Sequence, residues 1–202
     1  MESKNILQIG IYAGTFNPVH SGHISFALDA LQSVGLDEVY FLPERMPTDD
    51  VPAEHYGHRV AMLRRALLPH NNLEIAETAD KRFSVTGTLP RLRRVVGDSA
   101  LVFLMGADTF VSLLDLPNKE LLIDSCAFVV STRNKQEVAT VLAVAADLAV
   151  ASSALTLLDS PRPDVATQRV REALREQRDA PGLLPSVARY ARDEWLYVSI
   201  PL

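Results

Sequence analysis

A turn between a buried strand and a helix is predicted at Gly14-Thr15-Phe16-Asn17-Pro18-Val19-His20-Ser21-Gly22-His23. The residues before it, from Ile6 to Ala13, form an apolar run that is typical of a strand. From Ser21 to Val34, apolar residues recur at helical spacing, and Gly35 follows where a left-handed C-terminal cap is expected. A strand that turns directly into an amphipathic helix is typical of α/β proteins.

The same alternation of strand and helix continues along the chain. Strands are expected at Val39–Leu42, Leu73–Ala76, Leu101–Met105, Ala127–Ser131 and Leu155–Leu158, and helices at Tyr56–Leu68, Thr86–Val96, Thr167–Gln177 and Pro185–Glu194. In the first of these helices, Arg59, Arg64 and Arg65 are expected largely away from the apolar face. The alanine-rich stretch Val138–Ala154 fits either a helix or a strand.

This pattern predicts a Rossmann-like, doubly wound α/β fold with a mainly parallel sheet. Right-handed crossovers in such a fold leave a ligand crevice at the carboxyl ends of the strands. No internal repeat, low-complexity tract or linker interrupts the pattern, so a single domain is expected over residues 1–202.

Composition narrows the classes of partner. The chain of 202 residues has 48% hydrophobic and 22% charged residues, as ordinary globular proteins do. A net charge of -5 argues against a nucleic-acid surface as the partner, because duplex binding normally needs a dense field of Lys and Arg. Neither Met1–Asn5 nor any other stretch has the apolar length of a signal peptide core or membrane helix. We therefore expect no membrane contact and a cytoplasmic location, and composition leaves a homo-oligomer open.

The only cysteine, Cys126, cannot form a disulfide within the chain. It lies in an apolar run that is expected to be a strand, where a small buried side chain fits better than a reactive thiol. We expect Cys126 to be structural.

The turn at His20 and His23 has the features of a phosphate site. Gly14 and Gly22 let backbone N–H groups approach an anion, and a helix N-terminus adds unpaired N–H donors. The two histidines are three residues apart, so both rings can face one phosphate group. In the alternative, one histidine only caps the helix and the other is buried in the core.

Other nucleotide and metal motifs are absent from the sequence. It contains neither the P-loop pattern of many kinases and GTPases nor the G-x-G-x-x-G pattern of dehydrogenases. His55 and His58 could pair on a metal ion, but no third ligand is near them in sequence, and we predict no metal site of the protein's own.

The turn resembles the signature G-x-F-x-P-x-H-x-G-H of the nucleotidylyltransferase superfamily, and every fixed position is met. Further segments resemble the bacterial nicotinate-nucleotide adenylyltransferases. They are Leu36–Pro43, His58–Leu63, Met105–Phe110 and the C-terminal stretch from Leu184 to Tyr197. The resemblance implies an enzyme of NAD biosynthesis that joins the adenylyl group of ATP to nicotinate mononucleotide and releases pyrophosphate, with Mg²⁺ bound to ATP.

The resemblance also implies roles for individual residues. Those assigned to catalysis are His20, His23 and Arg171, and those assigned to ATP are Gly14, Thr15, Phe16, Gly22, Gly106, Asp108, Arg133 and Thr167. Two alternatives come from the residues themselves. Asp108 could be a helix N-cap, and Arg171 could be an ordinary exposed arginine of a helix.

The acceptor side is where the sequence departs from the family. The mononucleotide is expected near Ser84, Thr86 and Arg45. The stretch Pro47-Thr48-Asp49-Asp50 replaces the family's P-H-K, and Asn118 stands near the place of a family tryptophan. One alternative is a related transferase with another acceptor, such as phosphopantetheine or a sugar phosphate, because the turn around His20 is shared across the superfamily. The other is a nucleotide-binding protein without turnover, indicated by Asp49, Asp50, Ala166 and Gln168.

Overall fold

The computed structural model describes residues 6–46, 54–160 and 165–198. Within them, one six-stranded sheet has the strand order β3-β2-β1-β4-β5-β6, and every neighbouring pair of strands is parallel. The strands are β1 (Gln8–Gly14), β2 (Glu38–Pro43), β3 (Leu73–Ile75), β4 (Ala100–Gly106), β5 (Cys126–Thr132) and β6 (Leu155–Asp159). The predicted Rossmann-like, doubly wound fold is confirmed, since the chain winds outward in both directions from β1 and β4.

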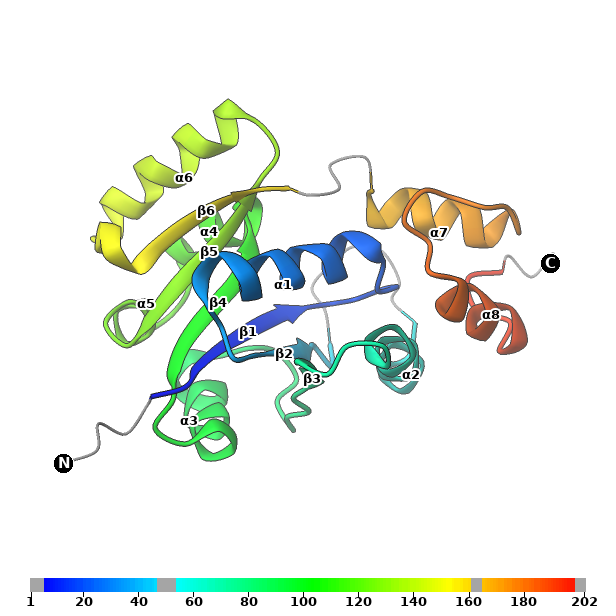
Figure 1. Ribbon diagram of the computed structural model, residues 1–202, viewed down its shortest axis with the longest axis horizontal. Coiled ribbons are helices and arrows are strands. Elements are labelled where there is room, and N and C mark those ends of the chain that lie inside the picture. Colours follow the sequence, from blue (N-terminus) through cyan, green and yellow to red (C-terminus); the bar gives the residue numbers. More distant parts are fainter. Residues whose placement is uncertain (1–5, 47–53, 161–164, 199–202) are drawn as a thin grey trace.

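Helices cover both faces of this sheet (Figure 1). They are α1 (Ser21–Val34), α2 (Tyr56–Leu67), α3 (Val85–Val96), α4 (Ala107–Ser112), α5 (Lys119–Ile123), α6 (Lys135–Asp147), α7 (Thr167–Arg175) and α8 (Pro185–Asp193). Apolar side chains of α1, α2, α7 and α8 share one buried cluster, and those of α3 to α6 share another. The sheet separates the two clusters, as expected for a sheet buried on both sides.

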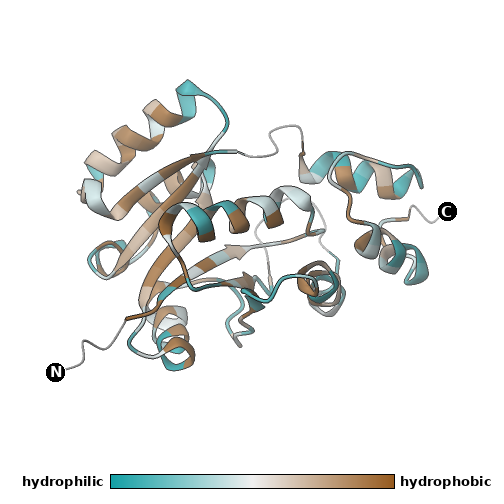
Figure 2. Ribbon diagram, viewed as in Figure 1, coloured by the Kyte–Doolittle hydropathy of each residue, from teal (hydrophilic) through white to brown (hydrophobic). Residues whose placement is uncertain are grey.

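The central strand β4 shows why the sheet is buried on both faces. Leu101, Phe103 and Met105 belong to the cluster with α3 to α6, whereas Val102 and Leu104 belong to the cluster with α1. Successive side chains of a strand point to opposite faces, so an uninterrupted apolar run supplies both cores. The strands accordingly run as hydrophobic bands through the middle of the molecule in Figure 2.

One local signal was interpreted correctly and one ambiguity is settled. Gly35 has φ 73 and caps α1 in the left-handed conformation. Most of the alanine-rich stretch forms α6, which begins after Asn134, whose side chain accepts a hydrogen bond from the Glu137 amide. Val141 and Val144 lie on its buried side, and this packing favours a helix over a strand. The short helices α4 and α5 were not predicted.

Cys126 is 8% exposed, and burial raises the pKa of its thiol, which agrees with a structural role. In the described part of the chain, no helix is long and apolar enough to cross a membrane. The cytoplasmic location stays a prediction.

Candidate active site

A cleft of about 460 Å³ opens at the carboxyl ends of β1 and β4, where the winding of the sheet changes direction. Ligands of open α/β sheets bind at this kind of position. The described residues that line the cleft are Tyr12, His20, Gly22, His23, Phe26, Gly106, Ala107, Asp108, Thr109, Ser131, Arg133, Ser160, Val165, Ala166 and Thr167. Seven of the predicted site residues are therefore brought together here from four separate parts of the chain.

His20 and His23 line this cleft side by side. Their rings stack with centroids 3.7 Å apart and planes 22° from parallel. The backbone N–H of His20 donates to Nδ1 of His23 at 3.2 Å, so the neutral His23 ring carries its proton on Nε2. His20 Nε2 is hydrogen-bonded to Thr167 Oγ1 at 3.0 Å. The alternative that one histidine only caps the helix is correct in part. The His23 ring caps the start of α1, but both histidines still line the cleft.

Both imidazoles are neutral at pH 7 in this arrangement. Burial lowers the pKa of His20 to about 4, and His20 is only 6% exposed. Burial and, to a smaller extent, the neighbouring His20 lower the pKa of His23 well below its ordinary value. Two stacked rings in a poorly solvated place resist protonation, since a charge on either is desolvated and would repel a charge on the other. The site therefore offers neutral N–H donors to an anion.

Gly22 lets the ring of His20 approach the start of α1. A Cβ at residue 22 would lie 3.1 Å from His20 Nδ1, closer than ordinary van der Waals contact. Nδ1 of His20 is buried and finds no hydrogen-bond partner among the described residues. A buried polar atom without a partner costs free energy, so a ligand or a water that hydrogen-bonds to Nδ1 would be favoured here.

Gly14, Thr15 and Phe16 shape the loop without being among the residues that line the cleft. The Gly14 carbonyl accepts a hydrogen bond from the Glu44 amide at 3.1 Å. Phe16 has φ 48, which is rare for a bulky residue. Its ring is 3% exposed and packs edge-on against His23, with centroids 5.2 Å apart, so core packing holds this strained turn in place.

Thr167 and Arg171 come from α7. Thr167 lines the cleft and contacts His20, as described above. Arg171 is half-buried, and its Nη1 donates to the backbone carbonyl of Asn17 at 3.1 Å. It is therefore not an ordinary exposed arginine, but its guanidinium contacts the backbone of the histidine loop and is not among the groups that line the cleft.

Gly106, Asp108 and Arg133 lie at the mouth of the cleft. The N-cap of α4 is Gly106 and Asp108 lies in the first turn, so the alternative of Asp108 as N-cap is wrong. Arg133 Nη2 lies 3.4 Å from Asp108 Oδ2, and its Nε lies 2.8 Å from Glu137 Oε1. Ion pairs between exposed side chains contribute only about 0–1 kcal/mol, so a ligand can displace the Asp108 pair at little cost.

The residues expected at the acceptor lie elsewhere. Ser84 is the N-cap of α3, where its Oγ accepts from the Gly87 amide at 3.2 Å, and Thr86 is exposed in the first turn. Arg45 is exposed, donates to the Thr78 carbonyl at 2.7 Å and stacks on Tyr56, with its Cζ 4.3 Å from the ring centroid. None of the three is among the residues that line the cleft.

Of the two departures from the family, the structure describes one. Asp49 and Asp50 lie outside the described residues. Asn118 is exposed at the start of α5 with φ 59, a left-handed conformation that asparagine tolerates.

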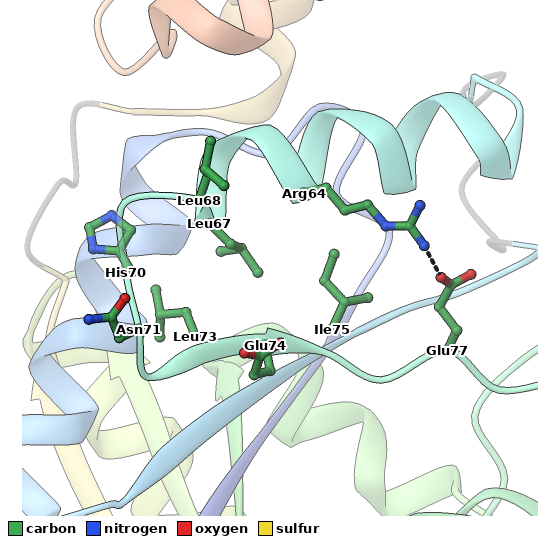
Figure 3. A pocket seen from close by; sticks show the side chains of 9 residues that line it. All are labelled: Arg64, Leu67, Leu68, His70, Asn71, Leu73, Glu74, Ile75 and Glu77. Atoms are coloured by element: carbon green, nitrogen blue, oxygen red, sulfur yellow. Dashed lines mark hydrogen bonds and ion pairs between the residues drawn. The ribbon is translucent and has the colours of Figure 1, made fainter.

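A second hollow, of about 490 Å³, lies between the end of α2 and the edge strand β3 (Figure 3). Two of its charged side chains, Arg64 and Glu77, pair with each other at 2.6 Å, and Leu67, Leu73 and Ile75 form part of the remaining wall. It lacks the convergent donors of the histidine cleft, so the chemistry of the molecule is assigned to the cleft.

Comparisons with known proteins agree with this geometry. Residues 11–173 match the family model described as Cytidylyltransferase-like. A protein of Aeromonas hydrophila named "Probable nicotinate-nucleotide adenylyltransferase" is 34% identical, over 94% of this chain and 96% of its own length. The Bacillus subtilis "Nicotinate-nucleotide adenylyltransferase" is 29% identical, over 95% of this chain and 99% of its own length.

The chain belongs to the nicotinate-nucleotide adenylyltransferase family. Its fold is also that of a solved structure, the Plasmodium falciparum nicotinic acid mononucleotide adenylyltransferase complexed with NaAD. The TM-score is 0.73 over 95% of this chain and 97% of the other, at 15% sequence identity. The two proteins therefore share a fold although few of their residues are identical.

In this member of the nicotinate-nucleotide adenylyltransferase family, Arg59 has a role that the sequence analysis missed. The prediction that it lies away from the apolar face of α2 is wrong, since it is 1% exposed. Its guanidinium donates to the backbone carbonyls of Thr15, Glu44 and Glu54, so it joins the loop after β1 to both ends of the connection between β2 and α2. Buried carbonyls need donors, and this corner has no regular structure to supply them.

The helical spacing contained a signal for this burial. Arg59 precedes the buried Leu63 by four residues and the buried Ala66 by seven, which places it on the inward face of α2. Arg64 and Arg65 are exposed as predicted.

Proposed function

We propose that the protein transfers the adenylyl group of ATP to nicotinate mononucleotide, forming the deamido-NAD dinucleotide and pyrophosphate. The stacked pair of neutral histidines at the start of α1, inside the cleft where the sheet changes its winding, supports this function most directly. The names of the full-length relatives support the choice of acceptor. The whole chain would act as one nucleotidyltransferase domain.

In this reaction, an oxygen of the acceptor phosphate attacks the α-phosphorus of ATP. A new P–O bond forms as the bond to the pyrophosphate leaving group breaks, and no protein nucleophile takes part. The protein supplies positioning and stabilises negative charge on the phosphoryl oxygens. His23 would donate from Nε2, the nitrogen left free by its Nδ1 contact with the His20 amide.

The remaining ATP contacts follow from the lining of the cleft. His20 and His23 would stabilise the α- and β-phosphates, assisted by backbone N–H groups at the start of α1 near Gly22. Thr167 would bind the outer phosphates, and Arg171 would join it by exchanging its bond with the Asn17 carbonyl for a phosphate oxygen. The adenosine would lie toward Gly106, Asp108 and Arg133, with Gly14, Thr15 and Phe16 holding the loop.

Mg²⁺ fits this site as a companion of ATP. Among the described residues that line the cleft, Asp108 is the one with a carboxylate, and the described residues hold no cluster of three or more candidate ligands. Magnesium commonly keeps its waters and binds through one or two carboxylates plus substrate phosphates, so a sparse donor set is adequate. When bound, it would neutralise part of the triphosphate charge.

The acceptor would approach from the side of α3, near Ser84, Thr86 and Arg45. Arg45 is held over Tyr56 at 4.3 Å and presents a cation at the exit of β2, where an anionic acceptor would be attracted. These three residues are not among those that line the cleft.

The direct test is pyrophosphate release from ATP and Mg²⁺ in parallel reactions with nicotinate mononucleotide, nicotinamide mononucleotide, phosphopantetheine and buffer. We expect release with nicotinate mononucleotide well above the other wells, together with the dinucleotide on chromatography. Release with phosphopantetheine alone would reassign the acceptor. ATP binding without release in any well would identify a nucleotide-binding protein without turnover. Size-exclusion chromatography of the same sample would test the homo-oligomer that composition leaves open.

A further inference from the structure

Asn17 is the point at which three distant segments meet the histidine loop. It is 3% exposed and precedes His20 by three residues. Its side-chain Oδ1 accepts from the Tyr197 hydroxyl at 2.8 Å and from the Glu54 amide at 3.3 Å. Its backbone carbonyl accepts from Arg171. The loop is therefore held from outside by the C-terminal segment, by the residues before α2 and by α7.

Tyr197 follows α8, and two hydrogen bonds hold it in this place. Besides the hydroxyl contact, its backbone N–H donates to Oε1 of Glu54 at 2.9 Å, which closes a ring of bonds through Asn17. The residue is 8% exposed and has φ 62. A left-handed conformation is unfavourable for a residue with a Cβ, so the surrounding contacts must overcome this strain.

The direction of the hydroxyl contact is set by the surroundings. Burial and, second, the carboxylate of Glu54 raise the pKa of Tyr197, so the phenol keeps its proton. It therefore acts as a donor toward Asn17 Oδ1. A buried hydrogen bond of this kind limits the movement of a loop whose other side carries His20.

We propose that Tyr197 is a positioning residue of the active site, whose hydroxyl fixes Asn17 and through it the loop that presents His20 and His23 to the phosphates. The segment after α8 is then part of the frame of the catalytic site. This inference rests on the proposed adenylyl transfer for its kinetic consequence. The hydrogen bond between Tyr197 and Asn17 does not depend on that function.

The same chain offers a matched control. Tyr190 in α8 also loses one hydroxyl hydrogen bond when changed to phenylalanine, but its partner is His58 Nδ1 at 2.9 Å in α2. We expect Tyr197→Phe to lower kcat about tenfold, with KM for ATP and for nicotinate mononucleotide changed less than about threefold, since a small displacement of catalytic groups acts mainly on turnover. Tyr190→Phe should keep kcat within about twofold. A kcat of Tyr197→Phe within twofold of wild type, or an equal loss in Tyr190→Phe, would overturn the proposal.

A double-mutant cycle tests whether the effect passes through Asn17. In the Asn17→Ala background, adding Tyr197→Phe should change kcat less than about twofold, because the acceptor of the hydroxyl is already gone. A further tenfold loss would overturn the proposal. Should Tyr197→Phe fail to fold, Asn17→Ala tests the same contact from the other side. A wild-type kcat in Asn17→Ala would also overturn the proposal.

Hydrogen–deuterium exchange gives a readout that does not depend on turnover. Peptides covering residues 14–24 should exchange several times faster in Tyr197→Phe than in wild type, and at the wild-type rate in Tyr190→Phe. If wild type releases no pyrophosphate with nicotinate mononucleotide, the proposed function fails. The exchange comparison then still decides the role of Tyr197, because unchanged exchange in this loop would refute it.

Discussion

Replacing His20 with glutamine should change how the stability of the protein depends on pH. His20 is buried and uncharged in the folded protein, with a pKa near 4, whereas an exposed histidine of the unfolded chain has a pKa near 6.5. Between these values the unfolded chain binds the proton more readily. The contribution of the neutral His20 to the stability of the folded protein is therefore complete above about pH 6.5 and is lost as the pH falls toward 4.

The size of this effect follows from the two pKa values. A tenfold change in an equilibrium constant is about 1.4 kcal/mol, so the full change is about 3 kcal/mol, of which about 2.5 kcal/mol is lost by pH 4.5. His20→Gln removes this proton-linked loss. The substitution also removes a neighbour that lowers the pKa of His23. This second change likewise makes the stability of the variant fall less at low pH than that of wild type.

The assay is urea unfolding followed by far-ultraviolet circular dichroism at several pH values from 7.5 to 4.5. The free energy of unfolding of wild type should fall relative to that of His20→Gln by about 2–3 kcal/mol over this range. His70→Gln, a matched imidazole deletion in the hollow beside β3, controls for the loss of a histidine elsewhere. A difference between wild type and His20→Gln that stays constant within about 0.5 kcal/mol would refute the neutral, buried histidine pair.

Three further outcomes are expected. His23→Ala should lower kcat about a hundredfold or more with an unchanged circular dichroism spectrum, because it removes one donor to the transition state; a loss below tenfold would contradict the site. Arg59→Met should lower the free energy of unfolding by about 3 kcal/mol, since three carbonyls lose their buried donor, whereas the exposed Arg65→Met should cost under about 1 kcal/mol in the same urea titration. Gly182→Ala should cost about 2–4 kcal/mol, because φ is 84 and the new Cβ would lie 2.4 Å from a methyl of Val165. Gly97→Ala, with φ 64 and open space around it, should cost only about 1 kcal/mol, and the same urea titration measures both glycine variants.

Local patterns predicted most of the secondary structure. The helix from Ser21 to Val34 has the predicted bounds, and the apolar runs became strands. These features follow from residue spacing, because a helix or strand buries side chains at a fixed period. The stretch after Val138 was ambiguous because alanine fits several environments, and packing against the sheet decided it.

Prediction of the site was less complete. The spacing of His20 and His23 indicated a phosphate turn, and the structure places both in the cleft with Asp108 and Arg133. Arg171 contacts the backbone of the histidine loop and does not line the cleft. Sequence spacing shows which face a side chain occupies, but the partner on that face depends on which elements pack there.

The sequence by itself determined the strand-to-helix turn, its two histidines and the alternation that makes a parallel α/β sheet. These depend on neighbours within a few residues. Only the tertiary structure decided that Thr167 lies beside His20, 147 residues away, and that Tyr197 bonds Asn17, 180 residues away. It also decided that the histidines are neutral, because the charge of a ring depends on how much water and which partners the folded chain leaves around it.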